Sequence, residues 1–163
     1  MVWMWVLACG GGSELEIGPD EVVIPDLTLR DQNDDPVELR SLAADPLVLE
    51  FATLWASRTF DETVGAELVE ERGDEGLRYA VFLMQDAVSM PADVEDAWAF
   101  ASHFAIPTVL WAPDPSQAVD LFRTWPEFWL VDERGVLLES EVTEGANPIE
   151  MVDRYYAEQA AER

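Results

Sequence analysis

The sequence predicts an α/β domain in which helices flank a central mixed β-sheet, with a β-hairpin added on its N-terminal side. Two apolar runs, 47–54 and 77–83, have the length and composition of buried strands. Between them Phe60, Val64 and Leu68 recur every fourth residue, as on one face of a helix. This order gives a βαβ unit, whose crossover we expect to be right-handed. With 163 residues, 49% of them hydrophobic, the chain can build one domain with a sizeable core.

The charge of the chain excludes two classes of partner. The formal net charge is −25, from 34 acidic and 9 basic residues. Nucleic acid and anionic membrane surfaces both bind positively charged protein surfaces, so neither is an expected partner. A highly solvated acidic surface, suited to a salty environment, explains the charge better than a specific basic ligand, although a cationic partner is compatible with it.

The histidine and cysteine content argues against a metal site and a disulfide. Cys9 is the only cysteine, so no intramolecular disulfide can form. His103 is the only histidine and has no Cys or His partner at ligand spacing, which favours a residue on a helix surface over a metal ligand. We therefore expect neither a metal nor a cofactor.

Residues 1–21 are predicted to precede the folded domain, which we place at 22–163. An apolar run, the small residue Ala8 and Cys9 lead into the Gly/Ser tether 10–13 and an acidic linker. The order resembles the end of a bacterial lipoprotein signal. It implies lipidation of Cys9 and a lipid-anchored protein of the bacterial cell envelope, facing the periplasm or the exterior. The alternative is an apolar stub with an incidental thiol. No other segment is apolar for long enough to span a bilayer.

The elements on either side of the βαβ unit follow from local patterns. Apolar and polar residues alternate over 24–29 and 36–39, around the turn-rich segment 31–35, which predicts the hairpin. After the second buried strand, 89–91 (Ser-Met-Pro) marks the start of a helix. We expect one face of that helix to carry Val94, Trp98, Ala101 and Ala105. A short strand over 108–111 follows.

The last third of the chain predicts a helix, a strand pair and a final helix. Segment 114–117 (Asp-Pro-Ser-Gln) has the pattern of a capped helix start, with Pro at the first helical position and Gln placed to complete a capping box. A strand then leads into the hairpin turn 132–135, and 136–142 returns beside it. Asn147 caps a helix whose buried face carries Met151, Val152 and Tyr155.

The first apolar run and the turn after it resemble the thioredoxin-like family, in the branch of TlpA-type and redoxin proteins. In that branch an apolar strand ends in Phe-x-x-x-Trp-Cys-x-x-Cys. Phe51 and Trp55 match this pattern, and Ala56 and Thr59 stand where the two cysteines would be. The resemblance implies a thioredoxin-like fold whose redox centre has been lost.

A second segment carries the same resemblance. Trp125 and Pro126 precede a strand and an Asp-x-x-Gly turn, and Pro126 stands where the family has its cis-proline. The resemblance implies a cis bond at Pro126 and a Trp125 that faces the turn 55–59. Glu50 lies where many thioredoxins keep a buried acid that moves protons to and from the cysteines. Here we expect a hydrogen-bonded structural group, the alternative being a remnant with a raised pKa. The matches together span 24–156.

The missing thiols argue against the chemistry for which the fold is best known. Disulfide exchange needs a thiolate and a second thiol that resolves the mixed disulfide, and a peroxiredoxin also needs a cysteine. Ala56 offers no nucleophile and Thr59 only a hydroxyl, so we predict no catalytic residue. The favoured hypothesis is a redox-inactive binding or accessory module in an extracytoplasmic compartment. The family itself implies the alternative of a thiol-disulfide oxidoreductase or peroxiredoxin-like antioxidant enzyme, and a purely structural domain is a third hypothesis.

Peptide binding is the function that the resemblance leaves possible without thiols. In the family, the backbone beside the cis-proline and the aromatic residue before the cysteine turn hold an extended substrate peptide by backbone pairing. The implied groove consists of Glu50, Trp55, Ala56, Thr59, Trp125 and Pro126. Trp55 and Trp125 would be its anchors, but Trp125 could instead fold over Ala56 and fill the site. Neither the partner nor the oligomeric state follows from the sequence.

Overall fold

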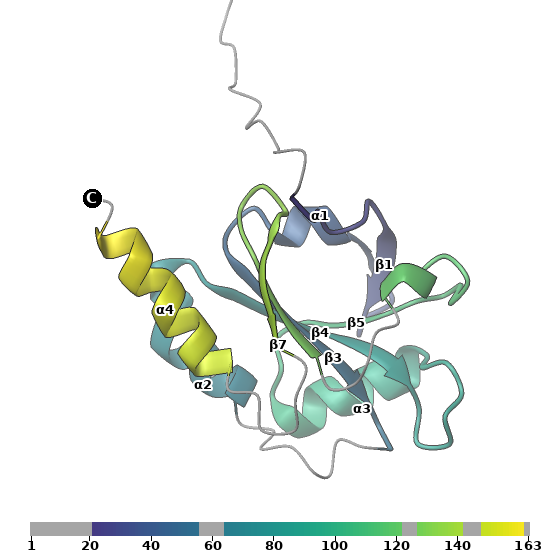
Figure 1. The fold of residues 1–163 in the computed structure, drawn as a ribbon. Coiled ribbons are helices and arrows are strands. Elements are labelled where there is room, and N and C mark those ends of the chain that lie inside the picture. The colour runs from purple at the N-terminus through teal and green to yellow at the C-terminus, as the bar shows by residue number, and fades with distance from the viewer. Residues whose placement is uncertain (1–20, 56–63, 122–126, 142–147, 162–163) are drawn as a thin grey trace, which may run out of the picture.

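The structure, a computed structural model, describes residues 21–55, 64–121, 127–141 and 148–161 of the chain (Figure 1). Seven strands of this part form one sheet in the order β2-β1-β5-β4-β3-β6-β7. The strands are β1 (Thr28–Asp31), β2 (Pro36–Glu38), β3 (Leu47–Thr53), β4 (Arg78–Gln85), β5 (Val109–Trp111), β6 (Glu127–Val131) and β7 (Leu137–Glu141). The helices are α1 (Leu39–Leu42), α2 (Val64–Arg72), α3 (Val94–Phe104) and α4 (Pro148–Ala161), with the 3-10 helices η2 (Gly73–Glu75) and η3 (Val119–Leu121).

The parallel pair β3 and β4 forms the centre of the sheet. Leu47 pairs with Arg78 at one end of the two strands, and Phe51 pairs with Phe82 toward the other. β5 runs parallel beside β4, whereas β1 pairs antiparallel with β5, β6 with β3, and β7 with β6. The predicted α/β class with a central mixed sheet flanked by helices is therefore confirmed.

Both faces of the central strands are buried, which is why their sequences are almost continuously apolar. Successive residues of β3 point to opposite faces, so Val48 and Leu49 belong to different buried clusters. The cluster of Val48 is completed by α2, α3 and α4, and the cluster of Leu49 by α1 and by the segment 112–121. Figure 1 shows this layering, with α2, α3 and α4 on one side of the sheet and α1 on the other.

The predicted N-terminal hairpin is present as β1 and β2, with Thr28 opposite Glu38. Its turn is built around the side chain of Asp31, whose Oδ1 accepts hydrogen bonds from the backbone N–H groups of Asn33 (2.8 Å) and Asp35 (2.9 Å). Asp34 adopts a left-handed backbone with φ 68°. The carboxylate of Asp31 thus adds to the backbone hydrogen bonds of the turn, in which Asp34 N donates to Asp31 O (3.0 Å) and Asp31 N donates to Asp35 O (3.0 Å).

The helix predicted to begin at 89–91 begins later. α3 starts at Val94 behind the N-cap Asp93, whose Oδ1 accepts from the N–H groups of Glu95 (2.9 Å) and Asp96 (3.1 Å). Asp96 Oδ2 accepts in return from the Asp93 N–H (3.2 Å), which completes a capping box. Pro91 instead pairs with Gln85 in an isolated bridge.

Val94, Trp98, Ala101 and Ala105 were predicted to share one face of this helix, and of these four only Ala101 is buried. Trp98 is 61% exposed, and Ala105 is exposed as well. The face against the sheet is formed by Ala97, Phe100 and Ala101. Small alanines let the helix approach the sheet, and this places the large indole on the outside.

The helix predicted from Asp114 is a run of 3-10 turns within the described residues. Hydrogen bonds of the i to i+3 type join Gln117 N to Asp114 O (3.0 Å) and Leu121 N to Ala118 O (2.8 Å). Asp114 does cap the segment, since its Oδ1 accepts from Ser116 N (3.0 Å). Gln117 Nε2, however, donates to the Asp114 carboxylate (2.9 Å). The second half of a capping box, in which the Gln117 side chain would accept from the Asp114 N–H, is therefore not formed.

The final helix is confirmed, and the first described residues are held by the sheet. Met151 and Val152 of α4 are fully buried. At the N-terminal side, Val22 O accepts from Leu137 N (2.7 Å), and Ile24 N donates to Gly135 O (2.9 Å). The chain therefore enters the fold beside the turn between β6 and β7.

Candidate functional site

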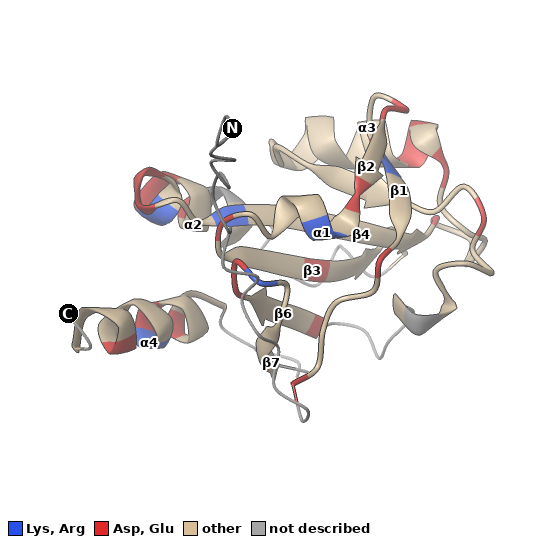
Figure 2. Ribbon diagram, turned by 90° about the horizontal axis from the view of Figure 1, so that it is seen from above, with Lys and Arg blue, Asp and Glu red and all other residues tan. Residues whose placement is uncertain are grey.

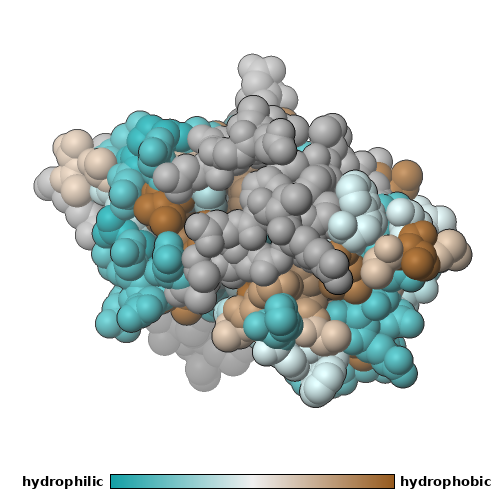
Figure 3. Space-filling model, turned by 90° about the horizontal axis from the view of Figure 1, so that it is seen from below, coloured by the Kyte–Doolittle hydropathy of each residue, from teal (hydrophilic) through white to brown (hydrophobic). Residues whose placement is uncertain are grey.

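The candidate site lies where the central strands end. In open α/β sheets, ligands bind outside the carboxyl ends of the parallel strands. β3 ends at Thr53, β4 ends at Gln85, and antiparallel β6 begins at Glu127, opposite Phe51. Figure 3 shows the molecule from below the view of Figure 1, with brown apolar surface beside teal hydrophilic surface.

Trp55 is an exposed aromatic side chain that is held in place at this edge. Its indole Nε1 donates to Gln85 Oε1 (3.0 Å), and the N–H of Leu54 donates to the backbone oxygen of Gln85 (2.9 Å). The last residue of β4 therefore holds the turn that follows β3 at two points. Trp55 is nevertheless 49% exposed, so a fixed apolar face is offered to solvent.

A few buried polar side chains lie next to this edge, in β3 and β6. Trp129 Nε1 donates to Glu127 Oε1 at 2.5 Å, and Glu127 is only 7% exposed. The Trp129 ring meets Phe51 edge to face with centroids 4.7 Å apart. Thr53 is 2% exposed, and its hydroxyl has no hydrogen-bond partner within the described ranges. Glu127 and Thr53 were not singled out from the sequence, because both lie in strands whose other residues have the pattern of a buried core.

Glu50 is tied to the neighbouring strand. It lies in the middle of β3, and the hydroxyl of buried Tyr79 in β4 donates to its Oε2. Burial, then the negative charge of Glu50 and the hydrogen bond to it, raise the pKa of Tyr79 well above its ordinary value. The Tyr79 ring also lies against Gly65 of α2, where a Cβ would come within 2.5 Å of Tyr79 Cζ. This is the hydrogen-bonded arrangement that we expected for Glu50.

Most of the predicted site lies outside the described residues. These are Cys9, Ala56, Thr59, Trp125 and Pro126. Of the implied groove the structure therefore places Glu50, in the sheet, and Trp55, at its edge. The cis bond at Pro126 and the position of Trp125 stay predictions. Gln85, which holds Trp55, was missed by the sequence analysis because a polar residue at a strand end carries no signal of its own.

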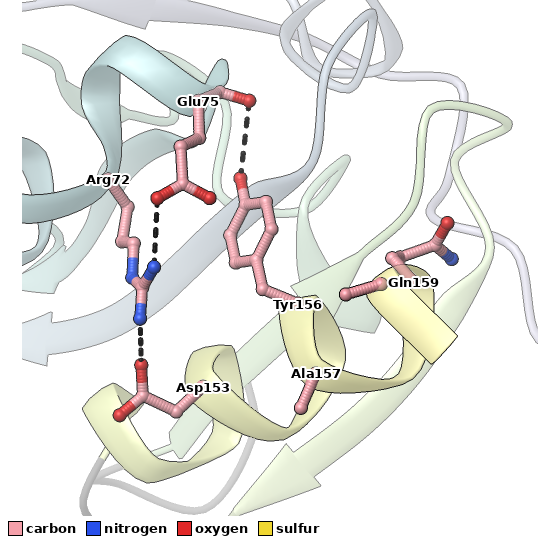
Figure 4. Close-up of a pocket in the computed structure, with 7 residues that line it drawn as sticks. Arg72, Glu75, Asp153, Tyr156, Ala157 and Gln159 are labelled. Atoms are coloured by element: carbon pink, nitrogen blue, oxygen red, sulfur yellow. Dashed lines mark hydrogen bonds and ion pairs between the residues drawn. The ribbon is translucent and has the colours of Figure 1, made fainter. Parts of the chain in front are cut away.

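A hollow lies at the other end of the sheet, between α4 and the end of α2 (Figure 4). Its volume is about 670 Å³. Arg72 donates to Glu75 (2.8 Å) and to Asp153 (2.5 Å), and its guanidinium lies 5.5 Å from the centroid of the Tyr156 ring. The hydrogen bonds to Glu75 and then to Asp153 raise the pKa of Arg72. The charged groups around the hollow are paired with one another. We therefore interpret these residues as an ion-paired contact that holds α4 against α2.

Two further properties of the described residues bear on function. Nowhere in these ranges do three or more His, Cys, Asp or Glu side chains gather closely enough to hold a metal ion. None of the helices in the same ranges combines the length and the apolar character needed to cross a bilayer.

Comparison with known proteins gives structural matches only. No protein-family model matches the chain, and no curated protein does. Among solved structures, it is similar to a secreted Mycobacterium tuberculosis disulfide oxidoreductase homologous to E. coli DsbE, with 18% identity, coverage of 81% of this chain and 96% of that one, and a TM-score of 0.60. It is similar to the thioredoxin domain of a thiol-disulfide oxidoreductase from Bacteroides vulgatus, with 15% identity, coverage of 82% and 95%, and a TM-score of 0.65. A third match is peroxidoxin BcpB from Mycobacterium tuberculosis, with 18% identity, coverage of 88% and 97%, and a TM-score of 0.62.

Proposed function

We propose that this chain, which has the thioredoxin-like fold, is a redox-inactive binding or accessory module that holds extended peptide segments at the carboxyl edge of its sheet. One observation carries the proposal. Cys9, in the segment that precedes the fold, is the only cysteine of the chain. A fold alone does not specify a function, so the loss of the thiols outweighs the activity named for the similar structures.

The residues at the site cannot replace the missing chemistry. Disulfide exchange proceeds through a mixed disulfide, and every step of it transfers a bond between sulfur atoms. Ala56 has no reactive atom, and the hydroxyl of Thr59 cannot form a disulfide. Reduction of peroxide by a peroxiredoxin-type mechanism meets the same obstacle, because the oxidised species is a cysteine sulfenate.

Binding, by contrast, needs surface and backbone rather than thiols. Trp55 supplies a large amphipathic ring, the residue type most enriched among interface hot spots. Because Gln85 holds the indole N–H, the ring loses little conformational entropy when a partner covers it. Backbone pairing beside Pro126 would add the strand-like recognition that the resemblance implies.

The same proposal includes a lipid anchor at Cys9 in the bacterial cell envelope. The described chain begins beside the turn between β6 and β7, because Ile24 N donates to Gly135 O there (2.9 Å). That turn lies at the end where β3 starts, since Val131 pairs with Leu47. The length of β3 puts this end about 20 Å from the candidate site. A tether that enters the fold at this end would leave the site free to face the aqueous compartment. Mass spectrometry of the native protein should find an acylated Cys9 as its first residue, and an unacylated Cys9 would contradict the anchor.

Titration with a thiol-free extended polypeptide tests the binding role. The probe is insulin B chain with both cysteines alkylated, and the protein is the full chain, wild type or Trp55→Ala. We expect saturable binding that Trp55→Ala weakens tenfold or more, since a central interface Trp contributes about 2 kcal/mol or more. The matched control is Trp98→Ala, which removes another exposed indole, that of α3, and should leave the affinity unchanged. Equal loss in both variants, or no binding by the wild type, would contradict the proposal.

A further inference from the structure

The turn that follows β4 is held by several hydrogen bonds and carries two apolar side chains at its tip. Asp86 Oδ1 accepts from the N–H groups of Val88 (2.8 Å) and Met90 (2.8 Å). Asp86 N donates to Met90 O (2.8 Å), and Gln85 pairs with Pro91. Ser89 adopts a left-handed backbone with φ 66°. The hydrogen bonds on both sides of the tip fix its conformation.

This turn exposes two large apolar side chains. Val88 is 74% exposed and Met90 is 60% exposed. A single exposed apolar side chain is ordinary, whereas exposed apolar side chains that gather in one patch mark interaction sites. Because the turn is already ordered, covering it with a partner costs little conformational entropy.

The third side chain is Trp55. Gln85 is the residue that precedes the turn, and it accepts the indole N–H of Trp55 (3.0 Å) and the N–H of Leu54 (2.9 Å). Gln85 therefore links the ring of Trp55 to the end of β4, where the turn begins. We call Trp55, Val88 and Met90 the apolar rim.

Acidic residues adjoin the apolar rim. The segment 85–98 contains Asp86, Asp93, Glu95 and Asp96 but no Lys or Arg. They lie close enough to interact, since burial and then the charges of Asp93, Asp86 and Glu95 raise the pKa of Asp96. Figure 2 shows red segments at the start of α3. A partner on this surface meets apolar side chains and negative charge together.

We propose that the apolar rim and the acidic residues beside it form a docking surface for a partner segment that carries both apolar and cationic side chains. The inference rests on the proposed function, because it names the class of peptide that the site holds. Charge complementarity selects this occupant. A second copy of the chain fits poorly, since each copy carries a net charge of −25.

Three synthetic decapeptides test both parts of the inference against the full chain. The first alternates Leu and Arg, the second alternates Leu and Glu, and the third alternates Ser and Arg. We expect the Leu-Arg peptide to bind at least tenfold more tightly than either counterpart, and its affinity to fall as salt is raised. Equal binding of the Leu-Glu peptide would overturn the cationic part, and equal binding of the Ser-Arg peptide would overturn the apolar part.

Two matched pairs of variants locate the surface. Val88→Ser with Met90→Ser should weaken the Leu-Arg peptide tenfold or more, whereas Leu138→Ser, which also removes an exposed apolar side chain, should not. Glu95→Lys should weaken the Leu-Arg peptide and strengthen the Leu-Glu peptide, and Glu133→Lys near the turn between β6 and β7 should do neither. Thermal unfolding confirms that each variant is folded.

The outcomes separate the inference from the function on which it rests. Peptide binding that depends on Trp55 but not on the Val88 and Met90 pair would overturn the docking surface and leave the proposed function standing. Absence of binding to every probe, alkylated insulin B chain included, would overturn both. Concentration-dependent self-association in sedimentation velocity that the double Ser variant abolishes would identify a second copy as the occupant and overturn the inference.

Discussion

Replacement of Tyr79 by Phe tests whether Glu50 is a structural group. The change removes the phenol O–H that donates to Glu50 Oε2 and leaves the ring in place. A hydrogen bond to a charged acceptor contributes about 1.5–3 kcal/mol. Glu50 is half-buried, so we expect a loss of about 2 kcal/mol in the free energy of unfolding at pH 7. For a domain of this size the melting temperature should fall by about 4–8 °C.

Urea denaturation of the full chain measures this loss, and pH dependence gives an independent check. Because the pKa of Tyr79 is raised in the folded state, the folded protein holds the phenol proton more tightly than the unfolded chain does. The resulting stabilisation is complete below about pH 10, the ordinary pKa of Tyr, and is lost as the pH rises toward the folded pKa. Above pH 10 the wild type should therefore lose stability by up to about 1.4 kcal/mol per pH unit more than Tyr79→Phe.

Tyr156→Phe is the matched control. Its hydroxyl makes only a long, exposed bond to Glu75 O (3.5 Å), so the change should cost less than about 0.5 kcal/mol. If Tyr79→Phe were as stable as this control at pH 7 and followed the wild-type pH profile, the Glu50 carboxylate would not depend on Tyr79. The structural role of Glu50 would then be refuted.

Three further substitutions are expected to change stability, each measured by urea denaturation. Gly65→Ala places a Cβ 2.5 Å from Tyr79 Cζ and should destabilise the fold by about 2 kcal/mol despite the better helix propensity of Ala; an unchanged midpoint would contradict this packing. Thr53→Val replaces a buried hydroxyl that has no partner within the described ranges and should stabilise by about 1 kcal/mol, whereas a loss would reveal a partner. Trp129→Phe takes the indole donor from buried Glu127 and should cost about 2 kcal/mol or more, while Glu127→Gln, which keeps the acceptor, should cost less; equal losses would argue against that bond.

The sequence predicted those elements whose signals are local. The apolar runs of β3 and β4 reflect burial on both faces, which needs no knowledge of partners. The turn 132–135 was predicted from its Asp-x-x-Gly pattern as part of the family resemblance, and the structure shows how both residues form it: Asp132 Oδ1 accepts from Val136 N (2.9 Å), and Gly135 has φ 78°. Local chemistry and global fold agree at these positions.

The errors arose where tertiary contacts overrode a local pattern. Pro91 has the appearance of a first helical residue, but its strand-like pairing with Gln85 and the capping box of Asp93 place the helix start later. Trp98 was placed on the same helix face as Ala101, yet alanine packing against the sheet buries Ala101 and leaves Trp98 exposed. Tyr79 was not identified as the partner of Glu50. The two residues lie on neighbouring parallel strands, β4 and β3, and the register of that strand pair cannot be predicted from a single sequence.

The central claim is that the chain has a thioredoxin-like site without thiol chemistry. The most direct test compares insulin reduction by the wild-type site with insulin reduction by an Ala56→Cys, Thr59→Cys variant. Both proteins carry Cys9→Ser, which removes the remaining thiol, and dithiothreitol is the electron donor. The wild type should not exceed the protein-free blank, whereas the variant, which restores Trp-Cys-x-x-Cys behind Phe51, should reduce insulin measurably faster. Turnover by the wild-type site above the blank would contradict a redox-inactive module. Failure of a folded Cys variant to gain activity would contradict the thioredoxin-like active-site pattern that the resemblance implies for residues 55–59.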